Sequence, residues 1–248
     1  QGMPPSVLET TLTPTKPKPK FVPCAGGNNG FRERRSPMMQ SFNAAPTLPT
    51  PLLHHIEQVS EGWINKYLLT YKMPDDSLFT YESVSRKKLD AYTHELRRDS
   101  STSPTPDAIS LVGHTVDDEL LLIREFRYPL NSWCIAFPAG LVEPGEDLAA
   151  CAERELLEET GYGLRTLNGK PCIRPLKQPG YSSTGMSEES VHTVFAEVEK
   201  RGDAQPESVE FIEVFTLPIS DIDTFLEENT LPIGTRCQLV LEGLSHTR

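Results

Sequence analysis

The sequence predicts an α/β protein in which a sheet lies between helices, and two observations support this. Strand patterns occur before and after an amphipathic helix within residues 139–162, and two further helical patterns close the chain. Elements in this order bury their apolar sides best when helices cover a sheet. The 248 residues are 37% hydrophobic, which suffices for one sizeable domain with appendages.

Charge and cysteine content disfavour several classes of function. Thirty-five acidic and twenty-four basic residues give a net charge of −11, which disfavours nonspecific binding to nucleic acid or to an anionic membrane surface. No long apolar run and no signal-peptide pattern occurs, so we expect a cytoplasmic protein without a membrane segment. The cysteines lack CxxC spacing and are expected to be reduced thiols. They are Cys24, Cys134, Cys151, Cys172 and Cys237.

Residues 1–50 are expected to form a disordered, Pro-rich tail. From residue 3 they are rich in Pro, Thr, Lys, Gly and Asn and show no sustained periodicity. The two residues before Met3 have the form of a remnant of a cleaved purification tag. A basic cluster at 32–35 is consistent with a docking segment, although a solvated tail is the preferred interpretation.

Residues 51–105 are expected to form an N-terminal extension built around an antiparallel hairpin. The expected elements are a short helix at 52–63, strands at 63–73 and 77–88, a turn at 74–77 and a polar loop at 90–106. Two strands alone are marginally stable, so this hairpin requires a further contact.

Residues 106–248 are expected to form the main domain. Strand patterns before the central helix occupy 107–116, 119–128 and 132–140, and those after it occupy 162–178, 190–199 and 209–217. A turn at Asn168-Gly169 interrupts the first strand after the helix. The last two helices are expected at 218–229, with Ser220 or Asp221 as cap, and at 234–244.

The central helix carries an unusual cluster of acidic residues. Helical spacing places Leu148, Cys151, Glu155, Glu158 and Glu159 on one stripe. Carboxylates near a helix C-terminus oppose the macrodipole, and Arg154, four residues before Glu158, compensates only in part. A bound cation would complete the compensation, and oxygen ligands without His or Cys suit Mg²⁺ or Mn²⁺. The alternative is a solvated acidic helix end.

This stretch resembles the Nudix box, a pattern of glycine, glutamate and arginine at fixed spacing. The fixed positions are filled by Gly140, Glu146, Arg154, Glu155, Leu156, Glu158, Glu159 and Gly161. Tyr162 departs from the pattern, which prefers an aliphatic residue there. The resemblance implies the α/β/α sandwich of the Nudix family, with a mixed sheet.

From about Trp63 to the C-terminus, the chain is similar to the ADP-ribose pyrophosphatase branch of that family. The similar stretches are TYESVSR at 80–86, REFRYP at 124–129, CIAFPAG at 134–140 and the loop after Pro179-Gly180. Pro179 lies two residues farther from Gly161 than this branch predicts, so an insertion is assumed. The resemblance implies a nucleoside diphosphate sugar as substrate and a homodimer built through residues 51–105.

The resemblance also implies roles for individual residues. Glu155 and Glu159 are the expected metal ligands, with Glu158 sharing or supporting and with the Ala139 carbonyl as a further ligand. Arg154 is expected to orient Glu158. The expected substrate-binding residues are Trp63 and Tyr81, which would stack on adenine, and Arg86 and Arg127, which would bind phosphate. The alternatives are strand-core aromatics and surface ion pairs.

A general base is expected in the loop before the last strand, where Glu210 aligns better than Glu207. Glu188 and Glu189 are weaker candidates. For Glu146 we expect at least a part in stabilising the N-terminal end of the helix dipole. His114 and His192 lie in strand patterns and are interpreted as structural.

The expected function is Mg²⁺-dependent hydrolysis of ADP-ribose to AMP and ribose 5-phosphate. The first alternative is a pyrophosphatase for another nucleoside diphosphate sugar. The second is a Nudix-fold sensor that binds ADP-ribose without hydrolysing it, which the intact glutamates disfavour. A third is a scaffold that binds a partner through its Pro-rich tail.

Overall fold

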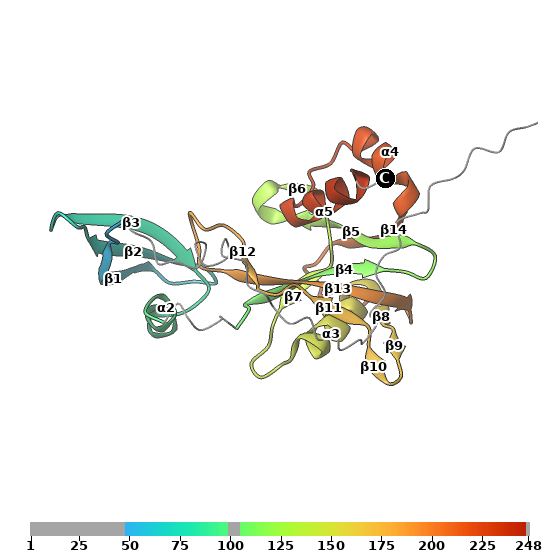
Figure 1. The fold of residues 1–248 in the computed structure, drawn as a ribbon, viewed down its shortest axis with the longest axis horizontal. Coiled ribbons are helices and arrows are strands. Elements are labelled where there is room, and N and C mark those ends of the chain that lie inside the picture. The colour runs from blue at the N-terminus through green and yellow to red at the C-terminus, as the bar shows by residue number, and fades with distance from the viewer. Residues whose placement is uncertain (1–47, 99–104, 247–248) are drawn as a thin grey trace, which may run out of the picture.

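The computed structural model describes residues 48–98 and 105–246. The predicted tail, except for its last three residues, and part of the predicted loop 90–106 lie outside the described residues. Figure 1 shows two sheets, a small antiparallel one near the N-terminus and a larger mixed one with helices on both faces. No helix in the described ranges has the length and apolar character needed to span a membrane.

The N-terminal sheet has three antiparallel strands in the order β1-β2-β3. They are β1 (Leu52–Ser60), β2 (Asn65–Lys72) and β3 (Leu78–Ser85). The predicted turn at 74–77 joins β2 to β3, and the Met73 N–H donates to the Ser77 carbonyl at 2.8 Å. The predicted antiparallel hairpin is therefore confirmed, with one further strand beside it.

Two local predictions for this extension are wrong. The predicted short helix at 52–63 is replaced by β1, because β2 offers this segment antiparallel ladder hydrogen bonds that outweigh its helical preference. The predicted loop 90–106 begins as helix α2 (Leu89–Leu96). The apolar residues of α2 at i, i+3 and i+7 (Leu89, Tyr92 and Leu96) pack on the N-terminal sheet. There the ring centroids of Tyr92 and Tyr67 lie 4.4 Å apart. This spacing was a readable helix signal that the polar composition of the segment obscured.

The main sheet has the central order β11-β13-β4-β5-β14, and four short strands pair at its sides. The bounds before the central helix are β4 (Ala108–His114), β5 (Glu119–Arg127), β6 (Ser132–Ala136) and β7 (Ala139–Leu141). Those after it are β8 (Tyr162–Leu164), β11 (Ile173–Pro175), β12 (Gly180–Tyr181), β13 (Ser190–Lys200) and β14 (Ile212–Pro218). Strands β13 and β4 are parallel and the other central pairs are antiparallel, so the sheet is mixed, as the resemblance implied.

The predicted strand 132–140 is two strands rather than one. β6 pairs with β5, whereas β7 pairs with β4. The break falls at Phe137-Pro138, because proline has no N–H group for a ladder hydrogen bond. Its carbonyl still accepts from the Leu111 N–H at 2.8 Å. The chain thus crosses from one strand neighbour to the next just before the glycine of the box.

The predicted turn at Asn168-Gly169 is confirmed. Both residues have positive φ, 53° and 74°, as a two-residue hairpin turn requires. The turn joins two short strands that form a separate small sheet, β9 (Thr166–Leu167) and β10 (Lys170–Pro171).

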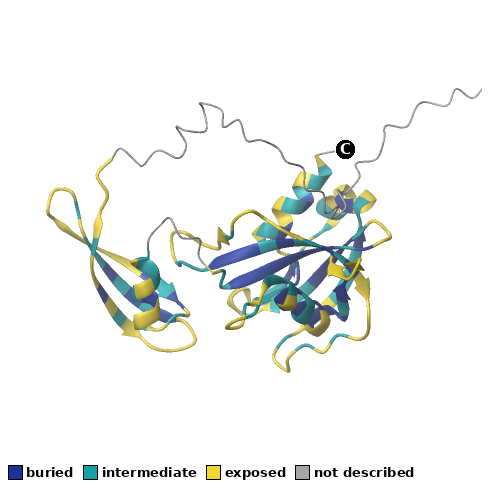
Figure 2. Ribbon diagram, turned by 60° about the horizontal axis from the view of Figure 1, so that its bottom comes forward, coloured by how far each residue is buried: buried dark blue, intermediate teal, exposed yellow. Residues whose placement is uncertain are grey.

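Helices cover both faces of the main sheet. They are α3 (Leu148–Thr160), α4 (Ile222–Glu228) and α5 (Thr235–Ser245), with short 3₁₀ turns at Tyr128–Leu130 and Ile219–Asp221. Figure 1 shows α3 on one face and α4 and α5 on the other. On β5, Leu121 packs towards α3, whereas Leu120 and Leu122 pack towards α4 and α5. Figure 2 shows the central strands buried between these layers.

Asp221 stands at the N-cap position of α4, as predicted, but its side chain makes no capping hydrogen bond. Its Oδ1 instead accepts from the Ser220 hydroxyl at 2.7 Å.

Candidate functional site

One cavity of about 1070 Å³ brings the predicted site residues together, a size suited to a nucleotide ligand. All the residues predicted to bind metal or substrate or to act in catalysis line it, apart from Tyr81 and the weaker base candidate Glu188. These residues are Trp63, Arg86, Arg127, Ala139, Arg154, Glu155, Glu158, Glu159, Glu189, Glu207 and Glu210. Its charged lining comprises seven glutamates and four arginines, so negative charge is in excess by three.

Helix α3 is held at both ends by local structure. At its N-terminus, Asp147 Oδ1 accepts from the Ala149 N–H at 2.9 Å and from the Ala150 N–H at 2.8 Å. At its C-terminus, Gly161 takes the left-handed conformation with φ 67°. A Cβ at Gly161 would lie 2.3 Å from the Gly202 carbonyl oxygen, so only glycine fits there. These two ends fix the helix that carries the acidic residues.

Arg154 organises the acidic residues of α3. Its Nε and Nη2 donate to the two carboxyl oxygens of Glu146, each at 3.0 Å, in a bidentate pair. Its Nη1 donates to Glu155 Oε1 at 2.7 Å and to Glu158 Oε2 at 3.3 Å. Hydrogen bonds from Arg154 hold the pKa of Glu146 down at about 2. Glu146 therefore anchors Arg154, beyond any effect on the helix dipole, and Arg154 contacts Glu155 more closely than the predicted Glu158.

Glu155 and Glu159 are buried, with 8% and 6% of their surface exposed, whereas the Glu158 side chain is 53% exposed. The Ala139 N–H donates to Glu159 Oε2 at 3.0 Å. Glu155 lies directly on Gly140, where a Cβ would come within 1.8 Å of its carboxyl carbon. Burial raises the pKa of Glu155, although Arg154 opposes this, and raises the pKa of Glu159 well above its usual range. Two carboxylates are thus buried with raised pKa values, and of the two only Glu155 is paired with Arg154.

The chemistry of these side chains fits a hard divalent cation. The donors are oxygen atoms only, which suits Mg²⁺ or Mn²⁺, and a cation would offset the cost of burying two carboxylates. Within residues 48–98 and 105–246, no three His, Cys, Asp or Glu side chains are already grouped as ligands of one ion. Glu155 Oε1 accepts from Arg154 and Glu159 Oε2 accepts from the Ala139 N–H, so the second oxygen of each carboxylate takes part in neither hydrogen bond.

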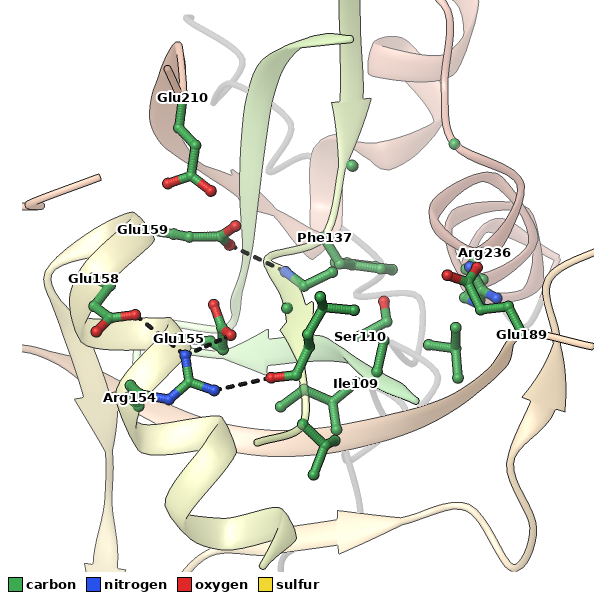
Figure 3. Close-up of a pocket in the computed structure, with 18 of the residues that line it drawn as sticks. Ile109, Ser110, Phe137, Arg154, Glu155, Glu158, Glu159, Glu189, Glu210 and Arg236 are labelled. Carbon is green, nitrogen blue, oxygen red and sulfur yellow. Dashed lines mark hydrogen bonds and ion pairs between the residues drawn. The ribbon is translucent and has the colours of Figure 1, made fainter. Parts of the chain in front are cut away.

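Glu207 and Glu210 belong to one turn before β14. The Glu210 N–H donates to the Glu207 carbonyl at 2.9 Å, and the Glu207 N–H donates to Glu210 Oε2 at 2.9 Å. Figure 3 shows the Glu210 carboxylate facing Glu159 across the cavity. Of the two candidate bases, Glu210 therefore faces the acidic helix, and the backbone of Glu207 holds its carboxylate.

The opposite wall of the cavity carries arginine side chains. Arg86, next to β3, forms an ion pair with Glu189, and both line the cavity. Arg236, in the first turn of α5, lines it as well and donates from Nη2 to the Ser182 hydroxyl at 2.8 Å. Figure 3 shows Glu189 and Arg236 on one side, away from Arg154 and the glutamates of α3. We call Arg86, Glu189 and Arg236 the guanidinium wall, and Arg154, Glu155, Glu158 and Glu159 the carboxylate wall.

Sequence reasoning missed Arg236 and ranked Glu189 low. The available signal for Arg236 was its place in the first turn of a predicted helix just after Gly234. Nothing local distinguished it, because its position on the cavity depends on how α5 packs on the sheet. Glu188, the neighbour of Glu189, accepts from the Ser85 hydroxyl and lies 3.4 Å from Lys87 Nζ. It supports the junction with β3 and does not line the cavity.

The remaining predicted residues differ in their surroundings. Trp63 precedes β2, is 76% exposed and lines the cavity, so the strand-core alternative for it is wrong. Tyr81 lies on β3 outside the cavity lining, and its hydroxyl donates to the Gly185 carbonyl at 2.7 Å. Arg127 lines the cavity and also pairs with Glu125 at 2.9 Å.

Both histidines with predicted structural roles are hydrogen-bonded. His114 Nε2 lies 3.0 Å from Asp118 Oδ1, and His192 Nε2 lies 2.7 Å from the Leu176 carbonyl.

Comparisons with known proteins agree with this fold. The NUDIX domain family matches residues 104–234. The chain is 33% identical over 177 residues to the ADP-sugar pyrophosphatase of Mus musculus, covering 69% of this chain and 75% of that protein. It is 28% identical over 200 residues to the ADP-ribose pyrophosphatase of Saccharomyces cerevisiae, covering 77% and 80%. A crystal structure of an ADP compounds hydrolase has the same fold, with a TM-score of 0.60, 21% identity and coverage of 82% and 96%.

Proposed function

Because this chain belongs to the Nudix family, in its ADP-sugar pyrophosphatase branch, it is a hydrolase, and we propose that it cleaves ADP-ribose to AMP and ribose 5-phosphate. The observation that carries the proposal is the cavity itself. It sets the carboxylate wall of α3 opposite arginines, which is the charge arrangement that a diphosphate with bound cations requires.

The proposed cofactor is Mg²⁺, with Mn²⁺ as a substitute. Glu155 and Glu159 would hold it, with Glu158 sharing and the Ala139 carbonyl as a further ligand. When bound, the ion would supply positive charge to the phosphate oxygens and lower the pKa of a bound water.

The proposed roles of the other residues follow from their places on the cavity. Arg86 and Arg127 donate hydrogen bonds to the diphosphate, and exposed Trp63 offers a flat face on which adenine can stack. Glu210 accepts the proton of the attacking water, and Glu207 is the second candidate. Tyr81 does not line the cavity of its own chain, so in this proposal it would contact adenine only in a dimer.

A homodimer built through the N-terminal sheet is part of this proposal. Large apolar side chains of that sheet are exposed, which supports an interaction surface. They are Leu52, Val59, Leu78, Phe79 and Tyr81. Light scattering at micromolar concentration should give twice the single-chain mass of 27.7 kDa, and the single-chain mass would contradict the dimer.

We further propose a reducing, cytoplasmic location, supported by the scattered cysteines, of which the four described are free thiols. The net charge of −11 supports a small-molecule substrate rather than a nucleic acid.

The decisive test is AMP release from ADP-ribose by the purified protein, first with Mg²⁺ and then with EDTA. We expect AMP and ribose 5-phosphate in equal amounts with Mg²⁺ and none with EDTA. Binding measured by calorimetry without AMP release at saturating Mg²⁺ would instead favour the sensor alternative.

A second candidate, a pyrophosphatase of broader substrate range, is favoured by the names of two relatives, an ADP-sugar pyrophosphatase and an ADP compounds hydrolase of Escherichia coli. Rates on ADP-ribose, ADP-glucose, UDP-glucose and GDP-mannose separate the two. A clear preference for ADP-ribose supports the first proposal, and a flat profile contradicts it.

A further inference from the structure

The loop of residues 182–189 joins three parts of the molecule at the cavity. The Ser182 N–H donates to the Glu189 carbonyl at 2.9 Å and closes the loop on itself. On one side β3 binds it, because the Val84 N–H donates to the Met186 carbonyl at 2.9 Å. On the other side Arg236 of α5 donates to the Ser182 hydroxyl. The N-terminal sheet and the last helix therefore meet the same short loop.

Glu189 ends this loop between two arginines. Its Oε1 pairs with Arg86 Nη1, and its charge favours the charged form of Arg236, whose pKa burial lowers. All three residues line the cavity. Two guanidinium groups and one carboxylate leave the guanidinium wall with a net charge of +1. Because a guanidinium has five N–H donors, Arg86 can pair with Glu189 and still donate to an anion.

An arginine held in place before a ligand arrives binds that ligand more tightly than a mobile one. Ordering a long side chain costs free energy, and a pre-existing ion pair removes that cost from the binding step. Arg86 lies outside the Nudix core and reaches the cavity only through β3. Its position is therefore set by what it contacts across the junction, and Glu189 is that contact.

We propose that Glu189 is a positioning residue: it holds Arg86 at the cavity. Arg236, bonded from α5 to Ser182 at the other end of the same loop, stands near this pair, so that the substrate diphosphate meets two ordered guanidinium groups. The inference rests on the proposed function, since it assigns these residues to the diphosphate substrate. It predicts that Glu189 contributes to substrate affinity and not to the chemical step.

The test is Glu189→Gln, which keeps the size of the side chain and removes its charge. We expect KM for ADP-ribose to rise about tenfold while kcat stays within about twofold. The Kd of the non-hydrolysable α,β-methylene analogue of ADP-ribose should rise by the same factor. An unchanged Kd would overturn the proposal.

The chain offers a matched control in the ion pair of Arg165 and Glu197. The side chains of that pair are 38% and 22% exposed, against 39% and 23% for Arg86 and Glu189, but it does not line the cavity. Glu197→Gln should leave KM, kcat and Kd unchanged. Equal thermal unfolding temperatures for the two variants would show that a difference in KM is not a difference in folding.

A double-mutant comparison tests whether Glu189 acts through Arg86. Arg86→Gln should weaken binding of the analogue at least tenfold, and adding Glu189→Gln should weaken it no further. Fully additive losses would mean that Glu189 acts on its own, which overturns the positioning role. Arg236→Gln should raise Kd, and an unchanged Kd would remove Arg236 from the wall.

The two readouts keep this inference separate from the proposed function. If the wild-type protein binds the analogue but releases no AMP from ADP-ribose, the hydrolysis proposal fails while the Kd series still decides the role of Glu189. If AMP is released and Glu189→Gln behaves like Glu197→Gln, the function stands and the inference fails.

Discussion

The two walls of the cavity are built in opposite ways. The carboxylate wall comes from one helix, α3, and rests on the adjacent segment at Ala139 and Gly140. The guanidinium wall joins Arg86, Glu189 and Arg236, and its ion pair links residues 103 positions apart in the chain. The groups proposed for the chemistry are therefore assembled locally, whereas those proposed to hold the substrate are assembled by tertiary contacts. Substitutions in the two walls should therefore affect different kinetic constants.

The walls also differ in electrostatic balance. Burial raises the pKa values of Glu155 and Glu159, so the carboxylate wall carries a desolvation cost that a bound cation would offset. In the guanidinium wall each charge lies beside an opposite one. The carboxylate wall should lower the free energy of unfolding, whereas the guanidinium wall should change it little.

The largest effect should follow Glu159→Gln. We expect kcat to fall about 10³-fold because a principal metal ligand is lost. Thermal stability should be equal or higher, because an amide is cheaper to bury than a carboxylate and can still accept from the Ala139 N–H. Initial rates with Mg²⁺ and calorimetric unfolding check this. A fall in both activity and stability would break the contrast between the walls.

Gly140→Ala should have the next largest effect, because it changes the shape of the carboxylate wall. The new Cβ would collide with the Glu155 carboxyl group, which must move, and a displacement of about 1 Å in such a site costs about 100-fold in kcat. Gly243→Ala in α5 is the control, because a Cβ there meets nothing within 4 Å. Activity similar in both variants would show that the position of Glu155 does not matter.

Trp63→Ala should affect binding only. Losing one stacking surface should raise KM for ADP-ribose about tenfold or more, with kcat nearly unchanged. Because Trp63 is exposed, the unfolding temperature should not change. A fall in kcat with constant KM would place Trp63 with the chemistry and contradict the division.

The smallest effect should be that of Glu146→Gln on stability. The folded pKa of Glu146 is about 2, below the unfolded value of about 4.3, so its pairing stabilises the fold fully above pH 4.3. This contribution is lost as the pH falls towards 2. The variant should unfold about 2–4 °C below wild type at pH 7, and the gap should close between about pH 4.5 and pH 2. A difference in unfolding temperature that does not change with pH would mean that the ion pair of Glu146 with Arg154 does not cause it.

Prediction from sequence succeeded where the signal was local. The spacing of glutamates on α3 and the turn at Asn168-Gly169 depend on contacts within a few residues, and both were predicted. It failed for β1 and α2, because a strand partner and a buried face are supplied by segments elsewhere in the chain. Phe137-Pro138 was misread as mid-strand, although the missing N–H of proline was visible.

By itself, the sequence determined the Nudix family, the central helix and its carboxylates, because a helix converts residue spacing directly into a shared face. The tertiary structure decided three arrangements. Glu146 pairs with Arg154, Glu155 packs on Gly140, and Arg86, Glu189 and Arg236 come together at the cavity. The physical reason is that an ion pair between residues far apart in sequence forms only after the sheet has packed, and no periodicity in the chain records it.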